Sequence, residues 1–308
     1  MSDLRSLSLK QLRAFAAVMK TGSVTQAAQQ LSVTPPAITT HLKTLESLAG
    51  GPILERNADG VAPTALGREL IRVADEMDTI IRRASGRMKS LNSGAEGSVV
   101  LGVVSTGKYF APSIVAAFGR ASPGIKVTLS IGNRGDVIAG LERGEFDLLI
   151  MGRPPGHIET ERVVLGDHPH ILIGPPDHRL VNDPEILPED LLRETFLARE
   201  PGSGTRGLMT RFLERIGDGR PFEIVEMGTN ETIKQAVMAG LGLAIISQHT
   251  CFAELADRRL IALSMPGLPL VRQWYLLHRA DHELDAASRA LRDFIRTNRT
   301  ALLPNNMP

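Results

Sequence analysis

The chain has 308 residues, of which 43% are hydrophobic and 4% aromatic, and its formal net charge is +1. This length exceeds one ordinary domain, and a core of Ala, Val, Leu and Ile suits helices packed on parallel sheets. No apolar run is long enough to span a membrane, no signal-peptide pattern is found, and the single cysteine, Cys251, excludes an internal disulfide and a thiolate metal cluster. We therefore expect a cytoplasmic protein of two or three compact units, with no membrane partner.

The positive charge is concentrated near the N-terminus. Residues 1–93 hold 12 Lys and Arg against 8 Asp and Glu, a net charge of +4, whereas the remainder of the chain carries −3. A basic N-terminal segment on an otherwise acidic chain favours a polyanionic partner for that segment.

Three short helices are predicted within the first 50 residues. Capping boxes that begin at Ser8 and Ser23 precede the first two, and Thr34 caps a third helix that begins with two prolines and runs to about Ala49. Two capped helices joined by a short turn predict a helix-turn-helix, in which the later helix enters a DNA major groove.

Small hydroxyl groups and one cation face outward from the third helix. Such side chains suit groove and phosphate contacts, although a three-helix scaffold with a merely solvated face is the alternative. The residues expected to contact DNA here are Thr34, Pro35, Pro36, Thr39, Thr40 and Lys43.

Residues 9–70, from LKQLRAF to TALGREL, resemble the LysR family of bacterial transcriptional regulators. The segments that carry the likeness include Gly22-Ser23-Val24-Thr25 in the second helix, Pro52–Arg56 in the wing and Pro63–Gly67 at the start of a linker helix. The resemblance implies a winged helix-turn-helix and adds Ser23, Thr25 and Arg56 to the expected DNA contacts. Pro35 departs from the family's usual Gln, which removes an amide that could reach a base edge.

A long amphipathic helix is predicted from a Thr64 cap to about Leu91. Its apolar positions alternate in steps of three and four, which is the spacing of a coiled-coil seam, and a rod of about 40 Å would expose them in a monomer. We expect a homodimer or homotetramer and an operator with two related half-sites. The seam positions are Leu66, Leu70, Val73, Met77, Ile80, Ala84, Met88 and Leu91.

Strands and helices alternate after a hinge at residues 92–97, which predicts an α/β, doubly wound domain. Strands are expected at 98–104, 126–131, 147–151, 170–173, 195–198, 222–227, 243–246 and 272–277, and helices near 110–119, 136–143, 205–216, 231–239 and 285–297. The LysR resemblance implies two lobes of the periplasmic-binding-protein kind, with a ligand in the cleft between them. The expected boundaries are 1–63 for the DNA-binding domain, 64–92 for the linker helix and 97–308 for the effector domain, with lobe I at 97–165 plus 268–303 and lobe II at 166–267.

Five basic residues lie beside strand-to-helix turns of this domain. One of these turns is the glycine-rich segment Arg199–Arg206. It combines free N–H groups and a helix dipole with two guanidinium groups, which predicts an anion pocket. Each arginine alone is also compatible with a solvated surface cation, and Asn230 with a helix N-cap. The expected effector contacts are Ser105, Thr106, Lys108, Asn133, Arg134, Arg153, Arg199, Ser203, Thr205, Arg206, Asn230 and Thr232.

Stretches such as VVSTGKYFAP and REPGSGTR resemble the CbbR subgroup of LysR regulators. That resemblance implies activation of Calvin–Benson–Bassham carbon-fixation genes in response to a phosphorylated metabolite or NADPH, a small-molecule effector rather than a cofactor. A LysR regulator of another operon, or a small-molecule-binding protein without a regulatory role, are the alternatives, and contact with RNA polymerase stays open.

An enzyme is not expected. The sequence has no paired carboxylates, no metal-ligand spacing and no nucleophile elbow. His168 and His170, on either side of a proline, fit structural histidines better than metal ligands. A secreted solute-binding protein would suit the second half of the chain but not the helix-turn-helix head.

Overall fold

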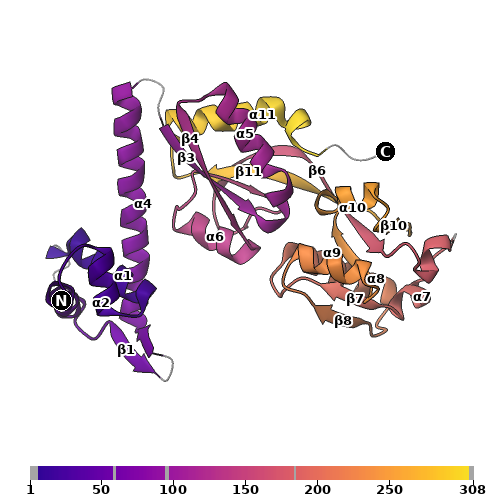
Figure 1. Ribbon diagram of the computed structural model, residues 1–308, viewed down its shortest axis with the longest axis horizontal. Helices are drawn as coiled ribbons and strands as arrows, with labels where there is room; N and C mark the ends of the chain where they lie inside the picture. Colours follow the sequence, from indigo (N-terminus) through magenta and orange to yellow (C-terminus); the bar gives the residue numbers. More distant parts are fainter. Residues whose placement is uncertain (1–5, 58–59, 94–96, 184, 305–308) are drawn as a thin grey trace. The chain divides into compact units, whose positions relative to one another are not determined.

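The computed structural model describes residues 6–57, 60–93, 97–183 and 185–304 (Figure 1). The chain divides into two units, one of Met1–Met88 with Arg143–Glu145 and one of Lys89–Glu142 with Phe146–Pro308. Among the described residues, no helix combines the length and apolar character that a membrane span needs.

The first unit contains three helices and a two-stranded wing, followed by a long helix. In chain order these are α1 (Leu9–Thr21), α2 (Val24–Gln30), α3 (Pro35–Ala49), β1 (Leu54–Asn57), β2 (Gly60–Pro63) and α4 (Ala65–Ser93). The strands β1 and β2 pair antiparallel. The core of this unit is made by apolar side chains of α1, α2 and α3, with Phe15, Ile38 and Leu45 fully buried.

Local capping signals account for the helix ends of this unit. The backbone N–H of Gln11 donates to Ser8 Oγ at 3.3 Å and the Ser8 N–H donates to Gln11 Oε1 at 2.8 Å, which completes the expected capping box. Ser23 accepts from the Gln26 N–H at 3.5 Å. Thr34 occupies the N-cap position of α3, but its side chain makes no capping hydrogen bond. Gly50, at φ +75°, ends α3 in the left-handed conformation that glycine adopts without strain.

The long helix α4 does not present all of its apolar residues for dimerisation. Leu70 and Ala74 are buried in the core of the first unit, and Val73 packs against it. Gly67 permits this approach, because a Cβ there would lie 2.2 Å from the carbonyl oxygen of Ile53. The expectation that Leu70 and Val73 belong to an exposed seam was therefore wrong.

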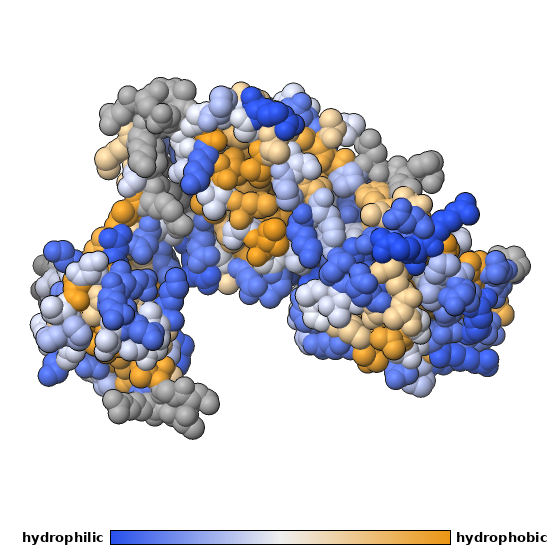
Figure 2. All heavy atoms as spheres, viewed as in Figure 1, coloured by the Kyte–Doolittle hydropathy of each residue, from blue (hydrophilic) through white to orange (hydrophobic). Residues whose placement is uncertain are grey.

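The exposed apolar residues of α4 form a different set. Figure 2 shows hydrophobic side chains on the visible part of this helix. They are Leu66, Met77, Ile80, Ile81 and Met88, with exposures between 37% and 64%. The side chain of Leu91 lies outside the described residues.

The second unit contains a seven-stranded sheet in the order β10-β6-β11-β5-β3-β4, with β9 also paired to β6. Its strands are β3 (Gly97–Val104), β4 (Ile125–Gly132), β5 (Leu148–Met151), β6 (Thr160–Gly174), β9 (Ala244–Ser247), β10 (Ile261–Leu263) and β11 (Leu270–Arg279). A second, parallel pair consists of β7 (Thr195–Ala198) and β8 (Glu223–Glu226). The three strands β4, β3 and β5 run parallel, whereas β11 is antiparallel to both β5 and β6.

Helices cover the sheets on both faces, as a doubly wound fold requires (Figure 1). They are α5 (Ala111–Ala121), α6 (Arg134–Glu142), α7 (Pro188–Leu192), α8 (Gly204–Gly217), α9 (Asn230–Met238), α10 (Phe252–Ala256) and α11 (Ala286–Leu302), with short 3-10 helices at Ser105–Tyr109, Arg179–Asn182 and Gln248–Thr250. In the first lobe α5 and α11 share one core with β3 and β11, while α6 packs into another.

The strands β6 and β11 belong to both lobes. On β6, Leu165 lies in the core of the first lobe and Leu172 in that of the second. On β11, Trp274 is buried in the first lobe and Leu270 packs against the second. The sequence predicted only residues 170–173 of β6, because charged residues and Pro169 interrupt its earlier half, and β10, α7 and α10 were not predicted.

The burial of Leu70 leads to a prediction about stability. Leu70→Ala should destabilise the first unit by about 2–5 kcal/mol, because it removes a buried side chain and leaves a cavity. Leu66→Ala, one turn earlier on the same helix and 42% exposed, should cost clearly less. Hydrogen exchange of the α1 and α3 amides in the full chain measures the difference. Equal protection in both variants would contradict the packing of α4 described above.

Candidate functional site

A cavity of about 260 Å³ opens in the second unit at the carboxyl ends of β3 and β5. Its wall comes from the start of α6, the glycine-rich turn before α8, and one face of β6 and β11. This position, outside the carboxyl ends of parallel strands, is where ligands bind in open α/β sheets. Seven of the expected effector contacts line it: Ser105, Thr106, Arg134, Arg153, Arg199, Ser203 and Thr205.

The lining of this cavity carries a large excess of positive charge. It contains five arginines, Arg134, Arg153, Arg199, Arg211 and Arg272, and a single carboxylate, Glu200. Glu200 is already paired with Arg199, because its two carboxylate oxygens accept from Nε and Nη2 of that residue at 2.7 and 2.9 Å. The other four arginines have no carboxylate partner among the described residues.

Two of these arginines lie close together. Arg134 donates through Nη1 to the backbone oxygen of Arg153 at 2.6 Å. Burial, and then the charge of Arg153, lower the pKa of Arg134. Two like charges held at one wall favour an anion between or beside them.

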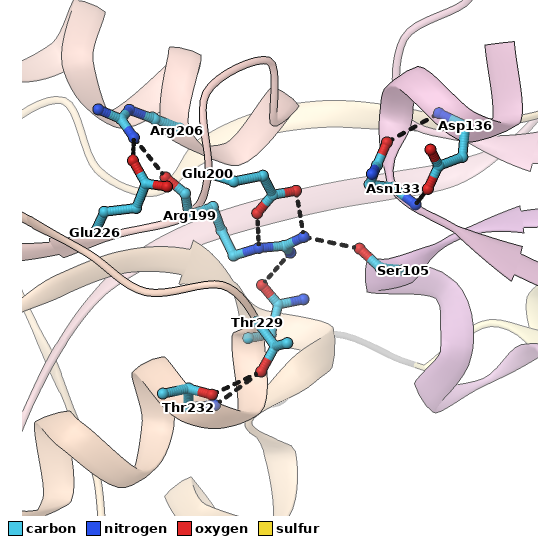
Figure 3. Close-up of polar contacts among 10 residues, drawn as sticks. Ser105, Asn133, Asp136, Arg199, Glu200, Arg206, Glu226, Thr229 and Thr232 are labelled. Atoms are coloured by element: carbon cyan, nitrogen blue, oxygen red, sulfur yellow. Dashed lines mark hydrogen bonds and ion pairs between the residues drawn. The ribbon is translucent and has the colours of Figure 1, made fainter. Parts of the chain in front are cut away.

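Arg199 has a structural role at the edge of the cavity (Figure 3). It is 5% exposed and, besides its pair with Glu200, donates to Asn230 Oδ1 at 2.7 Å and to Ser105 Oγ at 3.2 Å. These bonds join the end of β7 to the start of α9 and to the loop after β3. Asn230 is therefore held by Arg199 and does not line the cavity.

The start of α8 supplies the opposite wall. Ser203 is its N-cap residue but makes no capping hydrogen bond, and Thr205 in the first turn is buried. The first N–H groups of a 14-residue helix lack partners within the helix and carry partial positive charge. Hydroxyl groups, free N–H groups and nearby guanidinium groups together suit a phosphate or carboxylate.

Five expected effector contacts lie outside the cavity lining. Figure 3 shows three of them in other bonds. Arg206 donates to Glu226 Oε2 at 2.7 Å, Asn133 Oδ1 accepts from the Asp136 N–H, and Thr232 contacts Thr229 Oγ1. Lys108 lies over the ring of Tyr109, at 5.1 Å from its centroid, and Asn230 is bound to Arg199 as described. Nearness to a strand-to-helix turn did not determine which way these side chains point, so these five contacts stay predictions that the lining of the cavity does not support.

Four basic side chains of the lining were missed from the sequence: Arg211, Arg272, His168 and His170. Arg272 pairs with His168 across the β6–β11 ladder, and the alternation of strands puts His170 on the same face. The sequence signal for His168 and His170 was their spacing of two residues, which puts both side chains on one face of a strand. That face can be assigned to the cavity only when the pairing of β6 with β11 is known. Arg211 lies on α8, beyond the glycine-rich turn from which the anion pocket was predicted.

The first unit exposes the face expected to contact DNA. Thr25, Thr34, Pro35, Pro36, Thr39, Thr40 and Lys43 are all exposed on α2 and α3 or at their starts, whereas Ser23 is half-buried. Thr39 and Thr40 donate their hydroxyl protons to the backbone oxygens of Pro35 and Pro36 at 3.1 and 2.9 Å, so their oxygens are left as acceptors. Arg56 is in β1, but its side chain lies outside the described residues.

Comparison with known proteins agrees with both units. Residues 9–68 match the family model described as "Bacterial regulatory helix-turn-helix protein, lysR family", and residues 92–300 match "LysR substrate binding domain". The HTH-type transcriptional regulator CbbR of Xanthobacter flavus is 48% identical over 96% of this chain and 90% of its own length. The RuBisCO operon transcriptional regulator of Allochromatium vinosum is 38% identical over 94% of this chain and 95% of its own.

A solved structure with 32% identity covers the second unit. It is the regulatory domain of CcmR from Synechocystis PCC6803 in complex with 2-PG, with a TM-score of 0.63 over 68% of this chain and 99% of that chain. Family models match both parts of the sequence, and relatives match it nearly from end to end. This chain belongs to the LysR family of bacterial transcriptional regulators.

Proposed function

We propose that this LysR-type regulator controls a RuBisCO or other carbon-fixation operon by binding its operator as a homodimer, in response to a small phosphorylated anion. Support for the operon comes from the CbbR relative and from the RuBisCO operon regulator, which are similar over nearly the whole chain. A LysR regulator of a different operon is the alternative, and a footprint on the DNA beside a carbon-fixation operon distinguishes the two.

The observation that carries the effector proposal is the charge of the cavity. Arg134, Arg153, Arg211 and Arg272 surround it without a carboxylate partner among the described residues, and Glu200 is already bound to Arg199. Guanidinium groups bind phosphate and carboxylate through paired, charge-assisted hydrogen bonds. A volume of about 260 Å³ suits a small metabolite, and CcmR, the 32% identical structure, was solved with 2-PG.

The arrangement suggests how such an anion would be held. One anionic group would rest on Ser203, Thr205 and the start of α8, where free N–H groups favour phosphate. A second group would reach Arg134 and Arg153 at the opposite wall. We therefore propose an effector with two anionic groups, such as a phosphorylated acid or a sugar bisphosphate.

Dimerisation is proposed from the exposed stripe of α4. Met77, Ile80 and Met88 are too exposed and too close together on one helix to be explained by the fold of a single chain. Burying them against a second copy would give a two-fold symmetric regulator and an operator with two related half-sites.

The DNA-binding face leads to a first prediction for function. Thr39→Ala combined with Lys43→Ala should abolish a specific footprint, because it removes one exposed hydroxyl acceptor and the cation from the outward face of α3. Lys43→Ala alone should lower the slope of log affinity against log salt by about one, if Lys43 contacts phosphate. Lys126→Ala removes one exposed charge from the second unit and serves as the control. A footprint retained by the double variant would remove α3 from the DNA interface.

The cavity predicts a hierarchy of arginine effects. By calorimetry with 2-PG, ribulose bisphosphate, phosphoenolpyruvate and NADPH, at least one should bind the wild type with a dissociation constant below 1 mM (about −4 kcal/mol). Arg153→Ala should weaken that binding about ten- to a hundredfold, since charge-assisted hydrogen bonds contribute about 1.5–3 kcal/mol. Lys108→Ala removes a cation that lies outside the cavity and should leave the affinity unchanged. Binding lost equally in both variants would contradict this placement.

The α4 stripe predicts the outcome of introduced charge. Ile80→Glu and Met77→Glu should dissociate the dimer, because each places like charges against one another across the two-fold axis. Arg72→Glu, on an exposed polar position of the same helix, is the control and should not. Light scattering measures the mass of each variant. A wild-type mass in both stripe variants would exclude α4 as the dimer interface.

A further inference from the structure

Three imidazoles and an indole lie together beneath the arginine-lined cavity. The ring of His168 lies 3.9 Å from that of Trp274, at an interplanar angle of 16°, and 4.3 Å from that of His170. His249 is stacked in the same direction and accepts a hydrogen bond from Trp274 Nε1 at 2.9 Å. Trp274 is fully buried and is the only tryptophan of the chain.

Only one of the two ring nitrogens of His168 makes a hydrogen bond within the described part of the chain. Its Nε2 pairs with the hydroxyl of Ser247 at 3.0 Å, whereas its Nδ1 is buried and has no hydrogen-bond partner among the described residues. A buried polar atom without a partner is uncommon and costly, which marks this nitrogen as a site for a further interaction. The ring as a whole is 5% exposed.

The unpaired nitrogen lies on the side of the cavity. His168 and His170 both line the cavity, and Nδ1 of His168 faces Gly152, which lines it too. A Cβ at residue 152 would come within 2.8 Å of Nδ1, so only a glycine lets the backbone after β5 lie this close to the ring. The neighbouring Arg153 and the cross-strand partner Arg272 bring positive charge to the same place.

The groups around His168 disfavour its protonated form. From β6 it faces His170, from β11 Arg272, and from β9 and the helix after it Ser247 and His249. The cavity that it lines is also lined by Arg134, Arg153, Arg199, Arg211 and Glu200. The one carboxylate among them is paired with Arg199. Burial first, and then His170 and His249, hold the pKa of His168 well below its usual value, and burial lowers the pKa of His170 to about 4.

We propose that His168 takes up a proton from solvent when a multiply charged anion occupies the cavity, so that the effector is bound together with a proton. The resulting imidazolium donates through Nε2 to Ser247 and presents Nδ1–H toward the anion at Gly152. This inference rests on the anionic effector proposed above and adds an imidazolium to the arginines of its site. It favours ligands with two or more negative charges, since each further negative charge stabilises a protonated imidazole beside it.

The sign of the pH dependence follows from linkage. The protonated ring is favoured only with the anion bound, so the pKa of His168 is higher in the bound state than in the free state. Affinity should therefore rise as the pH falls through the bound-state pKa, by up to tenfold per pH unit for one proton, and be independent of pH above it.

The single tryptophan provides the measurement, because a protonated imidazole stacked on an indole quenches its fluorescence. The full-length protein is titrated from pH 8 to pH 5.5 without added anion and with sulfate raised until the emission no longer changes. Sulfate stays a dianion over this range, so any titration belongs to the protein. We expect constant emission without sulfate and a single quenching step with it. His168→Gln should remove the step, and His178→Gln, which removes another imidazole of the same lobe, should keep it.

Calorimetry separates this inference from the effector proposal on which it rests. Binding of sulfate at the pH midpoint of the quenching step, measured in buffers with different heats of ionisation, reports the protons taken up by the wild type. Gly152→Ala should reduce that number, because its Cβ would displace the ring from its place beside the cavity. Binding without proton uptake and without a quenching step overturns the role of His168 while leaving the anionic effector intact. A step that persists in His168→Gln overturns it as well. If neither sulfate nor any phosphorylated ligand binds, both proposals fail.

Discussion

The antiparallel pairing of β6 with β11 is the interaction on which the rest of the second unit depends. These strands run in register from Leu270 opposite His170 to Arg279 opposite Thr160, with one irregularity beside Trp274. Because each strand contributes side chains to both lobes, the ladder fixes where the lobes meet. It also puts His168, His170 and Arg272 on one face, and so builds the floor of the cavity.

The cavity is notable for charge that the protein leaves unbalanced. Arg199 shows how the fold treats an arginine that it uses structurally, because it is buried and bonded to Glu200, Asn230 and Ser105 (Figure 3). Arg134, Arg153, Arg211 and Arg272 receive no carboxylate partner in the described part of the chain. The contrast within one site separates cations that hold the structure together from cations proposed to hold a ligand.

Local signals in the sequence predicted local structure well. The capping box at Ser8, the proline start of α3, and the strand Thr195–Ala198 were all predicted, because each depends on residues close together in the chain. The predictions that failed depend on contacts between distant segments. Leu70 packs into the core of the first unit and Arg206 turns to Glu226 on β8, and neither partner can be read from helical spacing. His168 and Arg272 enter the site only through a strand pairing that joins residues about a hundred positions apart.

The central claim is that the arginine-lined cavity binds an anion with two charged groups, and a crystal structure of the protein grown with 2-PG tests it most directly. The account predicts phosphate density at the start of α8, within hydrogen-bond distance of Ser203 or Thr205, and the second anionic group beside Arg134 and Arg153. An empty cavity with 2-PG bound elsewhere on the chain would contradict it.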